Sequence, residues 1–117
     1  MGGRSDDRLI GNSVANLLRG KRGDDVLYSG GGRGDRLVGG SGKDQFWIET
    51  ESNAFIKIMD FSSKDRLVFD VDKSDLSVIT GRGHAFIEID SARLVKIVNF
   101  PEFSLDNDCL FNAFEGL

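Results

Sequence analysis

Residues 2–47 read GGRSDDRLI GNSVANLLR GKRGDDVLY S GGGRGDRLV GGSGKDQFW, where the spaces separate five nine-residue copies and one inserted Ser. The copies follow the pattern G-G-x-G-x-D-x-U-x, in which U is a large apolar residue. Self-similarity at a short fixed period indicates units that stack on their neighbours. This segment therefore decides the fold of the 117-residue chain.

Each copy combines a Gly-rich turn with a minimal strand. Glycine accepts backbone angles that a side chain forbids, so the first six residues can fold tightly with their carbonyl groups aimed at one point. The last three residues form a strand whose central side chain points inward. Two copies complete one coil, and the sequence predicts an all-β fold, a parallel β-roll.

The sixth position of each copy carries a carboxylate or, once, an amide. Because copies on the same side of a roll are two apart, we expect Asp7 beside Asp25 and Asp25 beside Asp44, while Asn16 faces Asp35. Paired carboxylates repel each other until a cation lies between them. Carboxylate and carbonyl oxygens are the ligands that Ca²⁺ prefers, so the sequence predicts calcium between the stacked turns.

The copies at 20–28 and 39–47 follow the pattern best, and the calcium site is expected mainly between them, on Asp25 and Asp44. The second copy has Val14 where the pattern has its third Gly, and a β-branched residue fits poorly in such a turn. We expect that copy to bind weakly or not at all. The other ligands predicted from the two best turns are Gly20, Arg22, Gly23, Gly39, Ser41 and Gly42.

These copies resemble the RTX family, the hemolysin-type calcium-binding repeats. Asp60-Phe61 and Asp65 look like the D-F-x-x-x-D segment that closes the roll in this family, so the resemblance covers residues 2–69 and adds Asp60 and Asp65 to the metal residues. It implies a β-roll with Ca²⁺ as cofactor, in a module that folds on extracellular calcium and belongs to a larger protein exported by type I secretion. The alternative is that the Asp residues only form turn hydrogen bonds.

The remaining sequence predicts strands and little helix. Alternating residues at 84–89 and 93–98 indicate a hairpin, and Gly81-Arg82-Gly83 indicates a turn. We expect residues 1–48 to form the repeat β-roll and residues 49–117 a β-rich cap that continues the same domain and closes its open end.

Charge suggests an alternative function. Residues 1–48 carry eight Lys or Arg against six Asp, whereas the rest of the chain is acidic. A basic surface attracts polyanions, so the alternative is a module for an anionic polysaccharide, resembling the repeat modules attached to alginate epimerases. Tyr28 and Trp47 would stack with Ile10, and a C-terminal cover over this column is the competing expectation. The predicted contacts are Arg4, Arg8, Arg33, Arg36, Tyr28 and Trp47.

An enzyme is not expected, because the single His84 and the single Cys109 have no recognisable catalytic neighbours. The Gly-rich turns lack the Lys-Ser/Thr ending of a phosphate loop. The sequence shows neither a membrane span nor a leader peptide. The expected partners are therefore calcium ions, the rest of a larger secreted polypeptide and, in the alternative, an anionic polysaccharide, with no nucleic acid.

Overall fold

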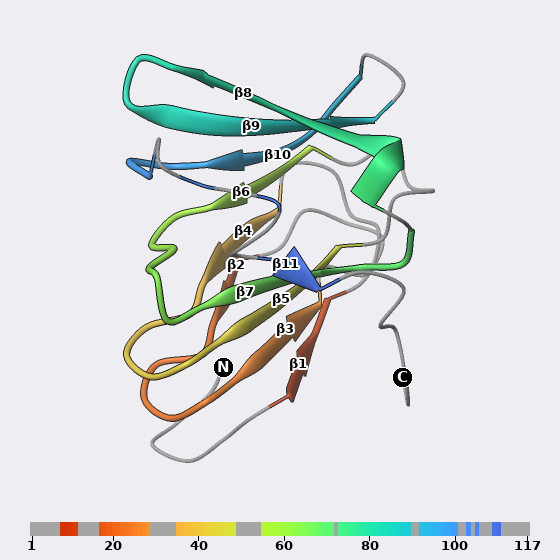
Figure 1. Cartoon of the computed structure of the whole chain (residues 1–117). Helices are drawn as coiled ribbons and strands as arrows, with labels where there is room; N and C mark the ends of the chain where they lie inside the picture. The colour runs from red at the N-terminus through yellow and green to blue at the C-terminus, as the bar shows by residue number, and fades with distance from the viewer. Residues whose placement is uncertain are drawn as a thin grey trace.

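The strands alternate between two facing sheets as the chain proceeds (Figure 1). This arrangement comes from a computed structural model. It describes residues 8–11, 17–28, 35–48, 55–71, 73–89, 92–100, 103, 105 and 109–110.

The first sheet is entirely parallel, and the second is parallel except for a hairpin at one edge. In spatial order, the first contains β1 (Arg8–Ile10), β3 (Val26–Tyr28), β5 (Gln45–Ile48), β7 (Arg66–Phe69) and β11 (Cys109–Leu110). The second contains β2 (Leu17–Arg19), β4 (Arg36–Val38), β6 (Ile56–Ile58), β10 (Ala92–Ile97), β9 (His84–Ile89) and β8 (Leu76–Gly81). A short 3-10 helix, η1 (Lys73–Asp75), precedes β8.

The central residue of each repeat strand points between the sheets. Leu27 pairs in register with Phe46, which pairs with Leu67, and all three are fully buried. Leu37 lies in register with Ile58 in the facing sheet, and both are also fully buried. The predicted parallel β-roll, with its inward column of apolar residues, is confirmed.

The two sheets continue past residue 48, where the sequence suggested a change from roll to cap. β6 extends the second sheet beside β4, and β7 extends the first sheet beside β5, both in parallel. The expected cap therefore shares both sheets with the repeats. β6 and β7 can join these sheets because they bury apolar side chains at the same inward positions as the repeat strands. The two strands do not follow the nine-residue period of the repeats.

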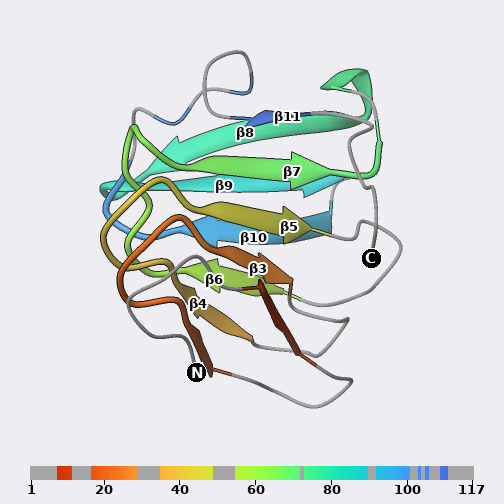
Figure 2. The ribbon, with the colours of Figure 1, turned by 90° about the horizontal axis from the view of Figure 1, so that it is seen from below.

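The predicted hairpins form the outer part of the second sheet. β8 and β9 are antiparallel and joined by a turn in which Arg82 and Gly83 have φ angles of 53° and 81°. β9 and β10 are also antiparallel, and β10 returns parallel to β6. In Figure 1, β10, β9 and β8 follow one another beyond β6, and Figure 2 shows β3, β5 and β7 following one another in the first sheet. Within the described residues, no helix is long and apolar enough to span a membrane.

Aromatic side chains from distant segments close the core beside β5. Phe61 lies with its ring centroid 6.2 Å from that of Phe46, and it meets Phe100 and Phe103 edge to face at 5.1 and 5.4 Å. Such tilted contacts are favoured by aromatic quadrupoles. The segment after β10 thus packs onto the last coil of the roll.

The column of outward residues on the first sheet is in the expected register. Ile10 pairs with Tyr28, and Tyr28 pairs with Trp47. Trp47 is 7% exposed, whereas Ile10 is 55% exposed. The column is therefore covered at its Trp47 end and open to solvent at its Ile10 end.

Candidate calcium site

Three turns stack on one margin of the roll, where the chain crosses from the second sheet to the first (Figure 1). They comprise residues 20–25, 39–44 and 59–65, and we call them the turn stack. The first two belong to the copies that follow the repeat pattern best. The third precedes β7 and lies outside the five copies.

Corresponding residues of the first two turns share a left-handed backbone. Lys21 and Gly40, at the second position of their copies, have φ angles of 71° and 82°. Gly23 and Gly42, at the fourth position, have φ angles of 98° and 100°. Glycine adopts these angles at little cost, which explains why the pattern requires it at these two positions.

The aspartates at the sixth position form a ladder through the turn stack. The backbone N–H of Asp25 donates to Oδ1 of Asp44 at 2.9 Å, and the N–H of Asp44 donates to Oδ1 of Asp65 at 2.9 Å. All three side chains are buried, each only 1% exposed. The predicted neighbourhood of Asp25 and Asp44 is therefore present, and Asp65 extends it by one turn.

The second carboxylate oxygen of Asp44 is buried and accepts no hydrogen bond. It faces Gly39 of its own turn, where a Cβ atom would lie 2.5 Å away. The Oδ2 atoms of Asp25 and Asp35 are also buried, and Asp25 faces Gly20 in the same way. Buried charged oxygens are normally paired or bound to metal. The turn thus presents an anionic oxygen for which a cation would be a suitable partner.

Backbone carbonyls of one turn lie against the glycines of the next. The Gly39 carbonyl oxygen would lie 2.8 Å from a Cβ atom at Gly20. The carbonyl oxygens of Lys21 and Gly23 would be the closest atoms to a Cβ at Gly40 and Gly42, respectively. The absence of side chains at these glycines is what allows the turns to approach so closely.

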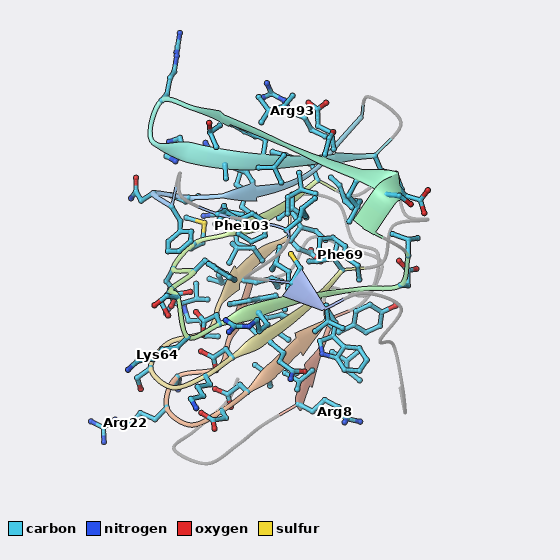
Figure 3. All side chains as sticks on the ribbon, in the orientation of Figure 1. Arg8, Arg22, Lys64, Phe69, Arg93 and Phe103 are labelled. Carbon is cyan, nitrogen blue, oxygen red and sulfur yellow. The ribbon has the colours of Figure 1, made fainter. Side chains whose placement is uncertain are left out.

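The two predicted ligands at the third position, Arg22 and Ser41, have exposed side chains. The Arg22 side chain points away from the roll (Figure 3), so only its backbone can serve a cation between the turns. Among the described residues, no three His, Cys, Asp or Glu side chains gather as a metal cluster. Each turn thus offers one buried carboxylate together with backbone carbonyls, a composition that would suit Ca²⁺.

Burial raises the pKa of Asp44 to about 7, against the opposing hydrogen bond from Asp25 and with further repulsion from Asp65, Asp25 and Asp60. Burial also raises the pKa of Asp65, although hydrogen bonds from Asp44 and Ser62 oppose this shift. A cation beside these carboxylates would lower their pKa, because an opposite charge favours the ionised form.

The closing turn satisfies its carboxylates with hydrogen bonds. Asp60 accepts one from the N–H of Gly39 at 2.9 Å and one from the N–H of Gly40 at 2.8 Å, on separate oxygens. Asp65 Oδ2 accepts from the backbone N–H of Ser62 at 2.9 Å and from its hydroxyl at 3.2 Å. Both residues were predicted as ligands, and in the structure all four of their oxygens accept hydrogen bonds.

The remaining predicted ligands lie elsewhere. Asp35 is fully buried before β4, on the opposite margin from the turn stack. Asp7 and Asn16 lie outside the described residues. Sequence reasoning missed Asp24, whose Oδ1 accepts a hydrogen bond from the Lys43 N–H at 2.7 Å and so joins the first two turns. The signal available was a second acidic residue directly before the repeat Asp.

Of the residues predicted for a polysaccharide, the two described arginines lie on different faces. Arg8 lies on the outer side of the first sheet and Arg36 on the outer side of the second, both exposed. Tyr28 is half-buried, and the buried Trp47 donates through Nε1 to Gln45 at 3.0 Å. Arg4 and Arg33 lie outside the described residues. The described members are therefore divided between two faces because successive copies alternate between sheets.

Comparison with known proteins agrees with this geometry. The RTX calcium-binding nonapeptide repeat matches residues 1–34 and 29–47, as four copies. The solution structure of the AlgE6R3 subunit of the Azotobacter vinelandii mannuronan C5-epimerase is similar in fold. Its TM-score is 0.61 at 24% identity, over 99% of this chain and 83% of that chain.

The crystal structure of the extracellular lipase LipA from Serratia marcescens gives a TM-score of 0.40 at 23% identity, over 91% of this chain and 19% of that chain. No curated protein matches the chain. The matched repeats imply Ca²⁺ as the cofactor. Together, these comparisons show that residues 1–47 carry RTX calcium-binding nonapeptide repeats and that the chain is similar in fold to a repeat subunit that forms a β-roll.

Proposed function

We propose that the chain is a calcium-driven folding module, without catalytic activity of its own, and that its principal site lies between the first two turns of the turn stack. The single observation that carries this proposal is the buried Oδ2 of Asp44, which accepts no hydrogen bond. Asp44 and Asp25 would hold the cation with the carbonyl groups of the turns at 20–23 and 39–42. Calcium would supply a positive charge beside the buried Oδ2 atom of Asp44.

Energetics support a folding role. Ordering a residue costs about 1–2 kcal/mol of backbone entropy, and glycine loses the most freedom of any residue. The turns contribute little apolar burial in return, while their buried carboxylates repel each other. Metal binding to a site that is absent from the unfolded chain adds its binding free energy to folding. The fold should therefore depend on calcium.

The proposed biological setting is extracellular. Affinities of extracellular calcium modules are typically about 10⁻⁴–10⁻³ M, far above cytosolic calcium concentrations. A module of this kind would stay unfolded before export through a type I channel and fold outside the cell, in support of a larger secreted polypeptide. The calcium-binding repeats support this setting, since it is the usual one for their family.

Within this proposal, Asp60 and Asp65 close the turn stack instead of holding an ion between them. Their oxygens accept hydrogen bonds from Gly39, Gly40, Asp44 and Ser62. The first three bonds join the turn at 39–44 to the closing turn, and the bond from Ser62 lies within the closing turn. The second function considered above, binding of an anionic polysaccharide, stays a prediction, and the two described arginines of its predicted set, Arg8 and Arg36, lie on different sheets.

The Asp44→Asn variant tests the site. The amide keeps the shape of the side chain and the acceptor for the Asp25 N–H, but it removes the charge. We expect calorimetry to show a calcium affinity weaker by roughly tenfold or more, because the number of carboxylates tunes the affinity of calcium sites. The matched control is Asp75→Asn, which makes the same change at an exposed residue of η1.

Calcium affinity should be unchanged in the control. Equal affinity in the Asp44→Asn variant and the wild type would contradict the proposal. Loss of affinity in both variants would show a general charge effect and would equally contradict a site at Asp44.

A further inference from the structure

β8 (Leu76–Gly81) lies at one edge of the second sheet and pairs with β9 on one side. In Figure 1 it is the uppermost strand of that sheet. In the part of the chain that the structure describes, no strand pairs with its other side. A strand edge of this kind presents backbone N–H and C=O groups that can pair with another chain. We call this open side the β8 edge.

The β8 edge lacks the features that usually protect a strand edge from pairing. Its six residues, Leu-Ser-Val-Ile-Thr-Gly, include no charged residue and no proline. Its register with β9 continues without a bulge, and Ile79 is 47% exposed. At the opposite edge of the same sheet, β2 has only three residues and ends in Arg19. Because short length, charge, proline and bulges are the usual protection, β8 is the more open of the two edges.

The hairpin fixes which residues of β8 direct their backbone groups to the open side. Gly81 pairs with His84 across a turn whose two residues have φ angles of 53° and 81°. Positive φ angles at both residues indicate a type I′ turn, which the flanking residues close as a hydrogen-bonded pair. Such pairs alternate along an antiparallel strand, so the backbone groups of Leu76, Val78 and Thr80 point away from β9.

A second copy of this strand is complementary to the β8 edge. When two copies lie antiparallel about a two-fold axis at Val78, the two Val78 residues pair with each other, and Leu76 pairs with Thr80 of the other copy. This register joins all the backbone groups that point to the open side, because each of these residues then opposes another of them. It also keeps the buried faces of the two sheets on the same side, which a shift by one residue would not do.

The charges at the two ends of β8 suit the same arrangement. Asp75 precedes the strand and Arg82 follows it, and both are exposed. In the register centred on Val78, Asp75 lies opposite Gly81 of the other copy, directly beside its Arg82. Opposite charges therefore meet at both ends of the paired strands, whereas parallel pairing would bring like charges together. Complementary charges of this kind fix the register of an interface.

Ile79 gains apolar burial in this arrangement. It lies opposite Phe86 of β9, on the face of the sheet away from the buried Ile87. In the two-fold register it opposes Ser77 of the other copy, and the two Ile79 side chains become diagonal neighbours. Diagonal neighbours lie about 7–8 Å apart, within reach of long side chains. An apolar side chain that is exposed in one copy is thus partly covered in the pair.

We propose that two folded chains associate through their β8 edges, so that the two second sheets become one continuous sheet across a two-fold axis. The direction of the backbone groups, the end charges and Ile79 all select a second copy of this chain, because each is complementary to itself. The use of the same patch on both subunits is typical of two-fold dimers. Strands of this length bury less surface than a standard interface, so the dimer should be weak. The dimer requires only a folded chain, whether or not calcium drives the folding.

Sedimentation equilibrium in saturating calcium and about 0.15 M salt tests the association, and circular dichroism confirms that the chain is folded. Over a concentration series up to about 1 mM, the average mass should rise from 12.9 kDa toward twice that value. A folded chain that stays monomeric throughout would leave the β8 edge to a strand of another protein and would overturn the inference. A chain that is folded and dimeric in chelator would instead contradict the proposed function, so the two failures are distinguishable.

The first variant is Ile79→Lys, which places a cation on the β8 edge. The two lysines would repel each other across the axis, and a lysine on an edge strand normally opposes pairing, so dimerisation should weaken by roughly tenfold or more. The matched control is Leu17→Lys, which makes the same change at an exposed apolar residue of β2, the other edge strand. Retained dimerisation in the control, with loss in Ile79→Lys, supports the proposal. Equal weakening in both would indicate a net-charge effect or another surface and would overturn it.

Charge reversal tests the register without altering the strand itself. Asp75→Arg and Arg82→Asp each bring like charges together at both ends of the pair, so each variant alone should dimerise roughly tenfold more weakly. Asp tolerates the left-handed backbone at position 82 better than most residues. A mixed dimer restores opposite charges at both ends, and an equimolar mixture should therefore regain the dimer mass. A mixture that stays monomeric, or single variants that dimerise as well as the wild type, would overturn the two-fold pairing.

Discussion

The first two turns of the turn stack and its closing turn each place an Asp in the same ladder, but the two kinds of turn differ in the hydrogen bonds that they donate to its carboxylate. Asp44 and Asp65 are consecutive members of one ladder, and both are buried. Asp44 keeps an oxygen that accepts no hydrogen bond, whereas Ser62 donates twice to the corresponding oxygen of Asp65. The difference arises from the residues around the carboxylate, not from the carboxylate itself.

Under the proposed function, the turns at 20–25 and 39–44 are binding turns, and the closing turn is a capping turn. The turn at 39–44 has Gly at its first, second and fourth positions, and the N–H groups of Gly39 and Gly40 donate to Asp60 and not to the Oδ2 atom of Asp44. The turn at 59–65 has Phe61 and Ser62 in its interior instead. Its Ser supplies donors, and its Phe anchors the turn to the core. We therefore propose that the repeat pattern keeps one carboxylate oxygen of its Asp available for a cation.

The largest expected effect comes from adding a side chain to a glycine of a binding turn. In Gly42→Ala, the new Cβ would meet the Gly23 carbonyl oxygen and would require a φ angle near 100°. Strained backbone of this kind costs about 1–3 kcal/mol, in addition to the contact. We expect calcium-induced folding to be lost or to require much higher calcium, as measured by circular dichroism.

The control for this variant is Gly81→Ala. A Cβ at Gly81 would meet no heavy atom within 4 Å, and its φ angle is outside the left-handed region. Its calcium dependence should match the wild type. If Gly42→Ala also behaved like the wild type, the close approach of the turns would not matter for binding.

An intermediate effect is expected from breaking the capping turn. Asp60→Ala removes the acceptors of the Gly39 and Gly40 N–H groups and should cost about 1–3 kcal/mol of unfolding free energy for the groups left unpaired. Urea unfolding at saturating calcium measures this loss. The number of calcium ions bound, measured by calorimetry, should not change. One ion fewer would show that Asp60 is a ligand, as the sequence resemblance implied.

The smallest effect is expected from restoring the repeat pattern at Lys21. This residue occupies a glycine position with a φ angle of 71°, and the left-handed conformation costs a residue with a side chain about 1–2 kcal/mol. Lys21→Gly should therefore stabilise the calcium-bound fold by about 1 kcal/mol, after the added freedom of the unfolded chain is considered. Thermal unfolding in calcium measures the change, and a lower midpoint than the wild type would contradict the explanation.

The repeat period was sufficient to predict the roll, because it sets which side chains face inward. Leu27, Leu37 and Phe46 could be assigned to the core from their position alone, and all are fully buried. The pairing of Asp25 with Asp44 followed from the same period. The repeat period could not reveal that Ser62 donates hydrogen bonds to Asp65, because these bonds depend on local turn geometry after the repeats end.

The pairing of outward-facing cations across the second sheet could not be predicted either. Arg36, Lys57 and Lys96 come from segments separated by 20 residues or more, and only the pairing of β4, β6 and β10 brings them together. The predicted arginines were chosen within the repeats, where alternation between sheets places Arg8 and Arg36 on opposite faces. Long-range register after residue 48 was the missing information.

The central claim is that calcium supplies the positive charge that the buried carboxylates of the binding turns need for folding. A calcium titration of the chelator-treated chain tests this claim most directly. Far-UV circular dichroism would follow folding, with magnesium as the control. We predict a cooperative gain of β-sheet signal with calcium and none with magnesium, which favours regular octahedral coordination and dehydrates reluctantly. A chain already folded in chelator, and unchanged by calcium, would contradict the account.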